Sequence, residues 1–347
     1  MNIRIDILCH NRFNKADSII VRLLKKHYDV TIDRENPDYV FIQSHRFHDT
    51  GNYQSDPIRI YWQVEANVPD FNLFDYAILR YDDIRYDDRC YFGDFGWWHH
   101  EFLANYDQAE TRRRKELLTK KKFCNFIYSH SCKERDQFFH LLNNYKRIDS
   151  FGKHLNNMGD LPPENQRYAS GWFPSSIELK RPYRFSIAFE NVYYPGYTTE
   201  KILTSFLAGT IPIYWGNPRI SQEFNSKAFI NCHEYESFDA VCERVIEIDN
   251  DTTMIQQMVK APSMTVEQHE KLQYALAKHE PDLESFLCRI IDQPIAKAHR
   301  RTLNRFSNKI YAFRNDPWYK FGRMGKRGKM IFLIRRILIR IFTSKKS

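Results

Sequence analysis

The amino-acid sequence predicts an α/β protein built from two consecutive α/β domains with a cleft between them. Its 347 residues are enough for two domains of ordinary size, each with its own core. Strand and helix patterns alternate at close spacing from the N-terminus, and a second alternating series begins at Phe123. Hydrophobic residues make up 42% of the chain, which is a globular composition and not a disordered one.

The first α/β series begins with an apolar strand over residues 3–9. Residues 15–27 place four aliphatic side chains on one helical face, at Ile19, Ile20, Leu23 and Leu24. Short strands are expected next, over residues 30–33, 39–43, 59–64 and 76–79. These elements form an expected N-terminal domain of residues 1–118. Its end falls in the charged stretch of residues 111–122, which is either a solvated helix or linker or a specific anion site.

The second α/β series predicts a domain of residues 119–295. It opens with a strand over 123–130, a helix over 133–145, a strand over 147–152 and a long polar loop. The alternating residues Phe185, Ile187 and Phe189 then mark a strand over 184–190. A helix around 202–207 ends at Gly209, and a strand covers 210–216. Residues 227–232 and a helix near 238–248 form another unit, and further helices reach about residue 293 with a break near Pro281.

The net charge of +9 belongs to the C-terminal end of the chain. Ten lysines and arginines and no acidic residue lie between Lys320 and the end, so the remainder holds 42 basic and 43 acidic residues. A nearly neutral body argues against nucleic acid as a partner. Residues 330–342 are apolar with arginines on one side, which is typical of an amphipathic helix on an anionic membrane surface. Residues 296–347 are therefore predicted to be a basic, membrane-associating helical tail.

Cysteine usage indicates a reducing compartment. The seven cysteines are scattered and never spaced as CxxC, so neither a disulfide framework nor a zinc site is expected. Cys232 and His233 are either half of a metal site or a buried thiol beside a histidine. The N-terminus has no signal-peptide pattern, and no stretch of the chain reaches the length of an apolar membrane span. A chain on the cytoplasmic side is expected.

The stretch FENVYYPGYTTEK, residues 189–201, joins a predicted strand to a predicted helix. Ligands of parallel sheets bind beyond the carboxyl ends of the strands, and a helix N-terminus suits phosphate. Glu200 can accept hydrogen bonds from a ribose diol, and Lys201 can supply a charge to phosphate, with Asn191 and Tyr197 nearby. The alternative is structural: Glu200 favours the helix dipole, and the tyrosines pack. Neither the dinucleotide motif nor the P-loop motif is present.

Three blocks of the sequence resemble a known family. Residues 189–218, FENVYYPGYTTEKILTSFLAGTIPIYWGNP, strongly resemble the signature of the α1,3-fucosyltransferases of glycosyltransferase family 10. Residues 60–78, IYWQVEANVPDFNLFDYAI, are similar to an N-domain block of bacterial members, and residues 129–142 to a third block. The resemblance implies a GT-B fold of two Rossmann-like domains facing across a cleft, with the acceptor on the first domain and GDP-fucose on the second.

The resemblance also implies roles for individual residues. Glu65 would be the general base of an inverting transfer. Five side chains would line the GDP-fucose site, with Glu200 on the ribose and two cations on the diphosphate: Arg135, Asn191, Tyr197, Glu200 and Lys201. Glu190 would contact the donor or the base, or serve structure alone. No metal or other cofactor is implied, and the acidic pairs Asp82-Asp83 and Asp87-Asp88 are interpreted as loop acids rather than metal ligands.

The acceptor is expected on the N-terminal domain. Trp97, Trp98 and His99 are candidates for it, because aromatic faces stack on sugars and imidazoles bond hydroxyls, although packing under the cleft explains them equally well. The family implies an N-acetyllactosamine-type acceptor and a Lewis x type product, here on a lipid-linked glycan at the inner face of a bacterial inner membrane. The alternatives are a GT-B transferase with another sugar nucleotide and a non-catalytic membrane- or nucleic-acid-binding protein.

Overall fold

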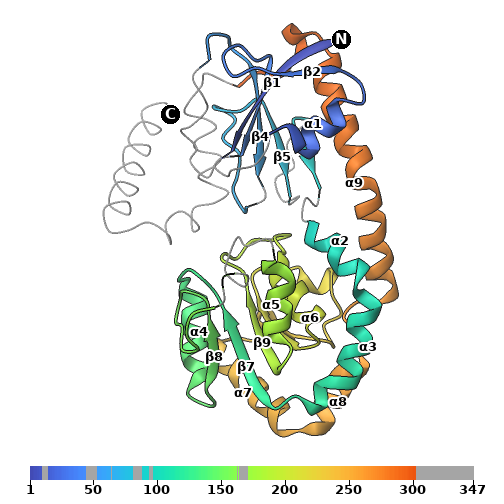
Figure 1. Cartoon of the computed structure of the whole chain (residues 1–347). Coiled ribbons are helices and arrows are strands. Elements are labelled where there is room, and N and C mark those ends of the chain that lie inside the picture. The colour runs from blue at the N-terminus through green and yellow to red at the C-terminus, as the bar shows by residue number, and fades with distance from the viewer. Residues whose placement is uncertain are drawn as a thin grey trace, which may run out of the picture.

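The structure is a computed structural model that describes residues 1–9, 15–43, 53–63, 65–80, 88–93, 97–161, 163 and 171–301. Two parallel β-sheets follow one another along the chain, which confirms the predicted α/β class (Figure 1). The carboxyl ends of the strands of both sheets point toward the gap between the domains, so residues that follow the strands gather there.

The first sheet has the strand order β2-β1-β3-β4-β5-β6, with every neighbouring pair parallel. Its strands are β1 (Asn2–Cys9), β2 (Asp29–Ile32), β3 (Tyr39–Gln43), β4 (Ile58–Gln63), β5 (Tyr76–Leu79) and β6 (Cys90–Phe92). Helix α1 (Ile19–Leu24) begins at Ser18, whose hydroxyl accepts a hydrogen bond from the Val21 amide. The aliphatic side chains of β1 and β4 are buried on this sheet, so it has a core of its own.

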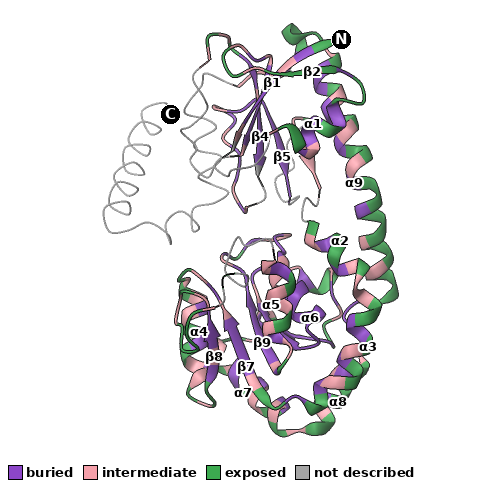
Figure 2. Ribbon diagram, in the orientation of Figure 1, coloured by how far each residue is buried: buried purple, intermediate pink, exposed green. Residues whose placement is uncertain are grey.

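The second sheet has the strand order β11-β10-β9-β7-β8 and is also parallel throughout. Its strands are β7 (Lys122–Ile127), β8 (Ile148–Phe151), β9 (Tyr183–Phe189), β10 (Ile211–Trp215) and β11 (Ile230–Asn231). Its helices are α4 (Lys133–Asn143), α5 (Trp172–Lys180), α6 (Glu200–Leu207), α7 (Phe238–Asn250) and α8 (Thr252–Lys260). Short 3-10 helices cover residues 15–17, 117–119, 220–222, 232–234 and 295–297. The strands of both sheets are buried at their centres (Figure 2).

The long polar loop predicted before β9 contains a helix, α5. Pro174 stands in the first turn of this helix, where its missing amide costs no hydrogen bond. The ammonium group of Lys180, at the end of α5, is buried and donates to the hydroxyls of Thr204 and Ser205 on α6. Burial lowers the pKa of Lys180 to about 7. Helix α5 therefore anchors the helix that follows the FENVYYPGYTTEK stretch.

Packing crosses the predicted limits of residues 118 and 295. Helices α2 (Trp97–Ala104) and α3 (Tyr106–Glu116) precede the second sheet but pack with it, because Phe102 and Ala109 share a core with residues of α6. Helix α9 (Val266–Asp292) leaves the second domain and returns to the first, where Leu283 and Ile290 join the core of the first sheet. Helices α2 and α3 thus pack on the second domain and α9 packs on the first, so these three helices connect the two domains.

The predicted break near Pro281 is wrong, because α9 runs without interruption through this residue (Figure 1). A proline inside a helix removes one backbone hydrogen bond. The apolar residues after it, Leu283, Phe286 and Leu287, are buried on the first domain, and this burial holds the helix together across the missing bond.

The charged stretch of residues 111–122 is largely helical and exposed, but two of its cations are buried. The Arg113 side chain is buried and donates to the carbonyls of Ala228, Met258 and Ala261. The ammonium group of Lys120 donates to the carbonyl of Ala208 at the end of α6, and burial lowers its pKa to about 7. These cations satisfy buried carbonyl groups at the base of the second domain.

The predicted C-terminal amphipathic helix lies outside the described residues, which end at Arg301. Just before that point the chain is fixed to the first domain, where Arg301 pairs with buried Asp75 and His299 pairs with Asp88. Within the described part of the chain, no helix combines the length and the apolar character needed to cross a membrane.

Candidate active site

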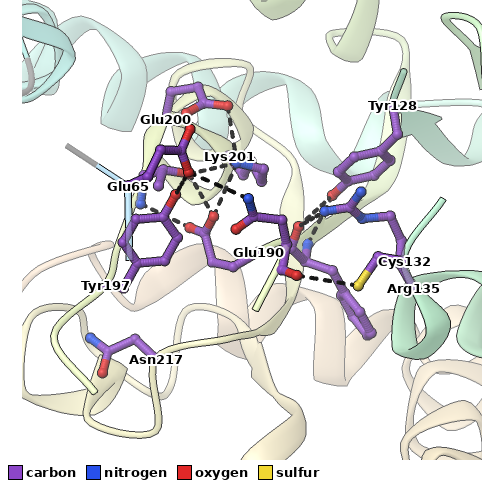
Figure 3. A network of polar contacts seen from close by, with 12 residues as sticks. Glu65, Tyr128, Cys132, Arg135, Glu190, Tyr197, Glu200, Lys201 and Asn217 are labelled. Carbon is purple, nitrogen blue, oxygen red and sulfur yellow. Dashed lines mark hydrogen bonds and ion pairs between the residues drawn. The ribbon is translucent and has the colours of Figure 1, made fainter. Parts of the chain in front are cut away.

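A carboxylate of the first domain meets the FENVYYPGYTTEK stretch of the second. Glu65 follows β4, and its Oε2 atom accepts a hydrogen bond from the Tyr197 hydroxyl at 2.8 Å. The Asn191 amide lies 3.5 Å from the same oxygen. Figure 3 shows Glu65 beside Tyr197 in this network. Three residues predicted to act together, from segments more than one hundred positions apart, are therefore in contact.

Apolar packing holds this contact between the domains. Ala66 and Val68, directly after Glu65, form a buried cluster with Val192, Tyr194 and Tyr197. Burial and the charge of Glu65 raise the pKa of Tyr197 well above its ordinary value. The Tyr197 hydroxyl therefore stays protonated at neutral pH and serves as a hydrogen-bond donor.

Glu190 is the most deeply buried carboxylate of the site, with an exposure of 0%. Its Oε1 accepts from the Thr199 amide at 2.8 Å, and its Oε2 accepts from the Thr199 hydroxyl at 2.6 Å. The Lys201 ammonium lies 3.0 Å from Oε2. Within the described part of the chain, Glu190 is thus held by the turn before α6 and by Lys201.

Lys201 uses all three of its donors within the site. Besides Glu190, it contacts the Thr199 hydroxyl at 2.7 Å and the Glu200 carboxylate at 3.2 Å. Desolvation opposes its charge, but Glu190 and Glu200 raise the pKa of Lys201 well above its ordinary value. Desolvation likewise opposes the charge of Glu200, yet Lys201 lowers the pKa of that carboxyl to about 2. Both groups are therefore charged at neutral pH, and both are partly exposed at the cleft.

The turn after β10 completes the site. Gly216 has a φ of 149°, and a Cβ atom there would lie 2.5 Å from the Cβ of Glu190. Asn217 accepts from the Gly196 amide at 2.8 Å and donates to the Thr198 hydroxyl. Both residues belong to the resembling block but received no role from the sequence. Their place at the end of the strand beside β9 is the signal that identifies them.

Arg135 lies in the first turn of α4 and is buried. Its guanidinium group donates to the carbonyls of His130 and Phe189, and its Cζ lies 3.8 Å from the centroid of the Tyr128 ring. The Tyr128 hydroxyl in turn donates to the Ile187 carbonyl at 2.8 Å. Tyr128, to which the sequence analysis gave no role, therefore holds the guanidinium group of Arg135 against the face of its ring.

Two buried polar atoms beside this network have no partner among the described residues, Oδ1 of Asn191 and Nε of Arg135. Buried polar atoms in proteins are nearly always hydrogen-bonded, so these two atoms are exceptions within the site.

The predicted acceptor residues separate into two groups. Trp97 packs against Trp172 and Phe173 of α5 and is 47% exposed. Trp98 lies under the guanidinium group of Arg80, and the buried ring of His99 is 3.4 Å from the same guanidinium. All three stand on α2, which packs on the second domain, and Trp98 and His99 contact Arg80 at the end of β5 in the first domain.

The structure agrees with a buried thiol at Cys232. Its side chain lies in the core of the second domain, where burial raises its pKa well above the ordinary value. The neighbouring His233 accepts a hydrogen bond from the Gly216 amide at 3.1 Å. In the described part of the chain no three His, Cys, Asp or Glu side chains are grouped as metal ligands. Asp82, Asp83 and Asp87 lie outside the described residues, and Asp88 pairs with Arg289.

Two family profiles match the chain. Residues 117–306 match the profile described as Glycosyltransferase family 10 (fucosyltransferase) C-term. Residues 6–95 match the Alpha-(1,3)-fucosyltransferase FucT N-terminal domain. The two matches divide between the two sheets, and the first contains the FENVYYPGYTTEK stretch.

Individual relatives agree with these profiles. Alpha-(1,3)-fucosyltransferase FucT of Helicobacter pylori is 31% identical over 127 residues, 36% of this chain and 24% of that protein. Alpha-(1,3)-fucosyltransferase B of Drosophila melanogaster is 35% identical over 112 residues, 31% of this chain and 25% of that protein. The matches thus span about a quarter of the length of these curated relatives.

A solved structure matches most of the fold. The crystal structure of an α1,3-fucosyltransferase with GDP-fucose superposes with a TM-score of 0.62 at 21% identity, covering 86% of this chain and 92% of that one. The predicted GT-B arrangement of two Rossmann-like domains is thereby confirmed.

Proposed function

Because this chain belongs to glycosyltransferase family 10, the fucosyltransferases, we propose that it transfers L-fucose from GDP-β-L-fucose to a hydroxyl group of a glycan. In finer detail, the proposed reaction is an inverting α1,3 transfer to N-acetylglucosamine in an N-acetyllactosamine-type glycan, with a Lewis x type product. The acceptor is proposed to be lipid-linked.

The observation that carries this proposal is the contact of Glu65 with Tyr197 and Asn191. A single-step inversion needs a base on the face of the sugar opposite the leaving group. Glu65 comes from the first domain, whereas the cations and the helix N-terminus belong to the second. A ligand in the cleft is therefore met by a carboxylate from one domain and by positive charge from the other.

The proposed transfer is a direct displacement at C1 of fucose. The acceptor oxygen forms a bond to C1 while the bond from C1 to the β-phosphate oxygen breaks and its electron pair stays on GDP. Glu65 takes the proton of the acceptor hydroxyl. Tyr197 donates to Oε2 of Glu65 and so helps to hold the carboxylate in place. A positioned carboxylate of this kind contributes about 10²–10⁴-fold to the rate.

The negative charge that develops on GDP is stabilised by Lys201 and Arg135 in this proposal. Glu200 is 24% exposed and Glu190 is fully buried, so a bound donor can displace only the former from Lys201. Glu200 then turns to the ribose hydroxyls, and the freed donor of Lys201 turns to the diphosphate.

No metal takes part in the proposed reaction, since protein cations face the diphosphate. In an assay made from metal-free reagents and containing an excess of chelator, the enzyme is expected to keep its full activity. A loss of activity that returns with a divalent cation would contradict this assignment.

The decisive test of the function is a panel of donors. GDP-fucose is compared with other GDP-sugars and UDP-sugars on N-acetyllactosamine and type 1 acceptors, and NMR identifies the product linkage. The proposal predicts transfer from GDP-fucose alone and an α1,3 linkage on N-acetyllactosamine. Preference for another donor would favour the alternative GT-B transferase, and binding of RNA or DNA without transfer would favour the non-catalytic alternative.

A further inference from the structure

A series of buried polar side chains runs from the second sheet to α6. The amide oxygen of Asn125 on β7 accepts a hydrogen bond from the Ser186 hydroxyl on β9 at 3.0 Å. The Ser186 hydroxyl lies 3.0 Å from the Ser205 hydroxyl on α6, which lies 3.2 Å from Nζ of Lys180. All four residues are buried, and the proposed reaction uses none of them.

Lys180 enters this series from the end of α5. Its Nζ atom lies 2.7 Å from the Thr204 hydroxyl, 3.2 Å from the Ser205 hydroxyl and 3.3 Å from the Lys201 carbonyl oxygen. These three acceptors belong to α6, so the side chain fastens that helix to α5. Burial lowers the pKa of Lys180 to about 7. An ammonium group has three donors and loses one of them with its proton, so the neutral amine can still donate to both hydroxyls.

The two hydroxyls that Lys180 contacts hold the main chain of two donor-site residues. The Thr204 hydroxyl donates to the Glu200 carbonyl at 2.8 Å, and the Ser205 hydroxyl lies 2.8 Å from the Lys201 carbonyl oxygen. Glu200 and Lys201 begin α6 and are the residues proposed for the ribose and the diphosphate. Lys180 therefore fixes their main chain, while their partly exposed side chains are able to turn toward a donor.

The start of α6 depends on contacts from outside the helix. Thr199 occupies the N-cap position, but its hydroxyl donates to Glu190 at 2.6 Å instead of capping the helix. Helix α6 has 8 residues, and helices of this length are not stable by themselves. The hydrogen bonds of Lys180 supply part of the missing support from the neighbouring helix.

We propose that Lys180 is a positioning residue for donor binding, which holds the first turn of α6 so that Glu200 and Lys201 meet the ribose and the diphosphate of GDP-fucose. The inference rests on the proposed function and deepens it by giving a buried residue of α5 a part in the affinity for the donor. In this proposal Lys180 acts through the hydroxyls of Thr204 and Ser205.

The test compares two buried lysines that hold opposite ends of α6. Lys180→Met removes the donors near the first turn, whereas Lys120→Met removes a donor to the Ala208 carbonyl, 2.8 Å away at the other end. Lys180→Met is expected to raise the dissociation constant of GDP, measured by calorimetry, about tenfold, the size of one lost hydrogen bond to a charged group. Lys120→Met is expected to keep the wild-type value, although both variants unfold at lower urea concentration.

Steady-state kinetics separate positioning from a merely structural role. Lys180→Met is expected to raise the KM for GDP-fucose about tenfold and to leave the KM for the acceptor unchanged, because Glu65 belongs to the other domain. A merely structural role would lower the amount of folded enzyme, and so the apparent kcat, with both KM values unchanged.

A second variant covers the case in which Lys180→Met does not fold. Thr204→Val keeps the shape of the side chain without the hydroxyl that links Lys180 to the Glu200 carbonyl, and it is expected to weaken GDP binding about threefold. If Lys180 acts through this hydroxyl, the double variant binds GDP no more weakly than Lys180→Met alone.

A wild-type dissociation constant for GDP in folded Lys180→Met would overturn the positioning role, as would equal weakening in Lys120→Met. Should Lys180→Met fail to fold, a wild-type value in Thr204→Val would overturn it. These outcomes leave the proposed function intact, whereas absence of transfer from GDP-fucose by the wild-type protein would overturn the proposed function itself.

Discussion

At the scale of a single residue, the burial of Glu190 bears directly on which role this carboxylate has. The sequence left three roles open for Glu190: contact with the donor, contact with the base, or structure alone. A carboxylate within a ligand-binding motif has the same sequence pattern in all three cases. We propose the structural role, because Glu190 is completely buried and is bonded to Thr199 and Lys201. By contrast, the sequence did predict that Glu65 and Tyr197 belong to one site, because both lie in blocks that resemble the family. It did not predict the hydrogen bond between them.

The Glu190→Gln variant tests through pH whether Glu190 supports the charge of Lys201. Glu190 and Glu200 hold the pKa of Lys201 up against desolvation, so loss of one carboxylate lowers it. The ammonium charge is lost as pH rises through that lowered pKa, and the affinity for the diphosphate falls with it. Calorimetry at a neutral and at an alkaline pH is expected to show a steeper loss of GDP binding with rising pH in the variant than in the wild type. An equal weakening at both pH values would show that Glu190 does not support this charge.

At the scale of elements, the strands were the best predicted part of the fold. The alternating Phe185, Ile187 and Phe189 of β9 and the apolar run of β10 indicated strands that the structure contains. Helix α5 was missed because only Phe173 and Lys180 are buried on it, so no apolar stripe marks its face. The course of α9 was missed because the local effect of Pro281 is outweighed by burial on the other domain, which a local pattern does not contain.

The turn after β10 allows a prediction about stability. A Cβ at Gly216 would lie 2.5 Å from both Cβ and Cγ of Glu190, which is tied to Thr199 and has no room to yield. Gly216→Ala is expected to lower the free energy of unfolding by about 3 kcal/mol, measured with urea.

Gly159→Ala is the control for this change. Gly159 also has a positive φ, of 87°, but no atom lies within 4 Å of its added Cβ, so only backbone strain of about 1 kcal/mol is expected. Equal losses in the two variants would show that the contact with Glu190 contributes nothing.

At the scale of the whole molecule, the first sheet brings the carboxylate of Glu65 to the cleft and the second brings the ammonium group of Lys201. Helices that pack on both domains hold the two sheets in place. The resemblance predicted this arrangement, whereas the docking of α2 and α3 on the second sheet and of α9 on the first required the structure. The apolar cluster around Tyr197 then keeps Glu65 at the second domain.

The basic tail belongs to the same scale. We propose that residues 320–347 attach the protein to the inner face of a bacterial inner membrane, because each of their ten basic residues adds about 1 kcal/mol near an anionic surface. A protein lacking residues 320–347 is expected to keep its activity on soluble acceptors and to remain in the supernatant after sedimentation with anionic vesicles. Sedimentation of the truncated protein with the vesicles would contradict the proposed role of the tail.

The most direct measurement of the central claim is turnover by Glu65→Gln. Glutamine keeps the size of the side chain and still accepts from Tyr197, but it cannot take a proton from the acceptor. The kcat for fucose transfer is expected to fall about 10²–10⁴-fold with GDP binding unchanged, while Glu101→Gln, an exposed position on α2, retains wild-type kcat. Wild-type turnover by Glu65→Gln would remove Glu65 from the mechanism and contradict the assignment of the cleft as a two-domain active site.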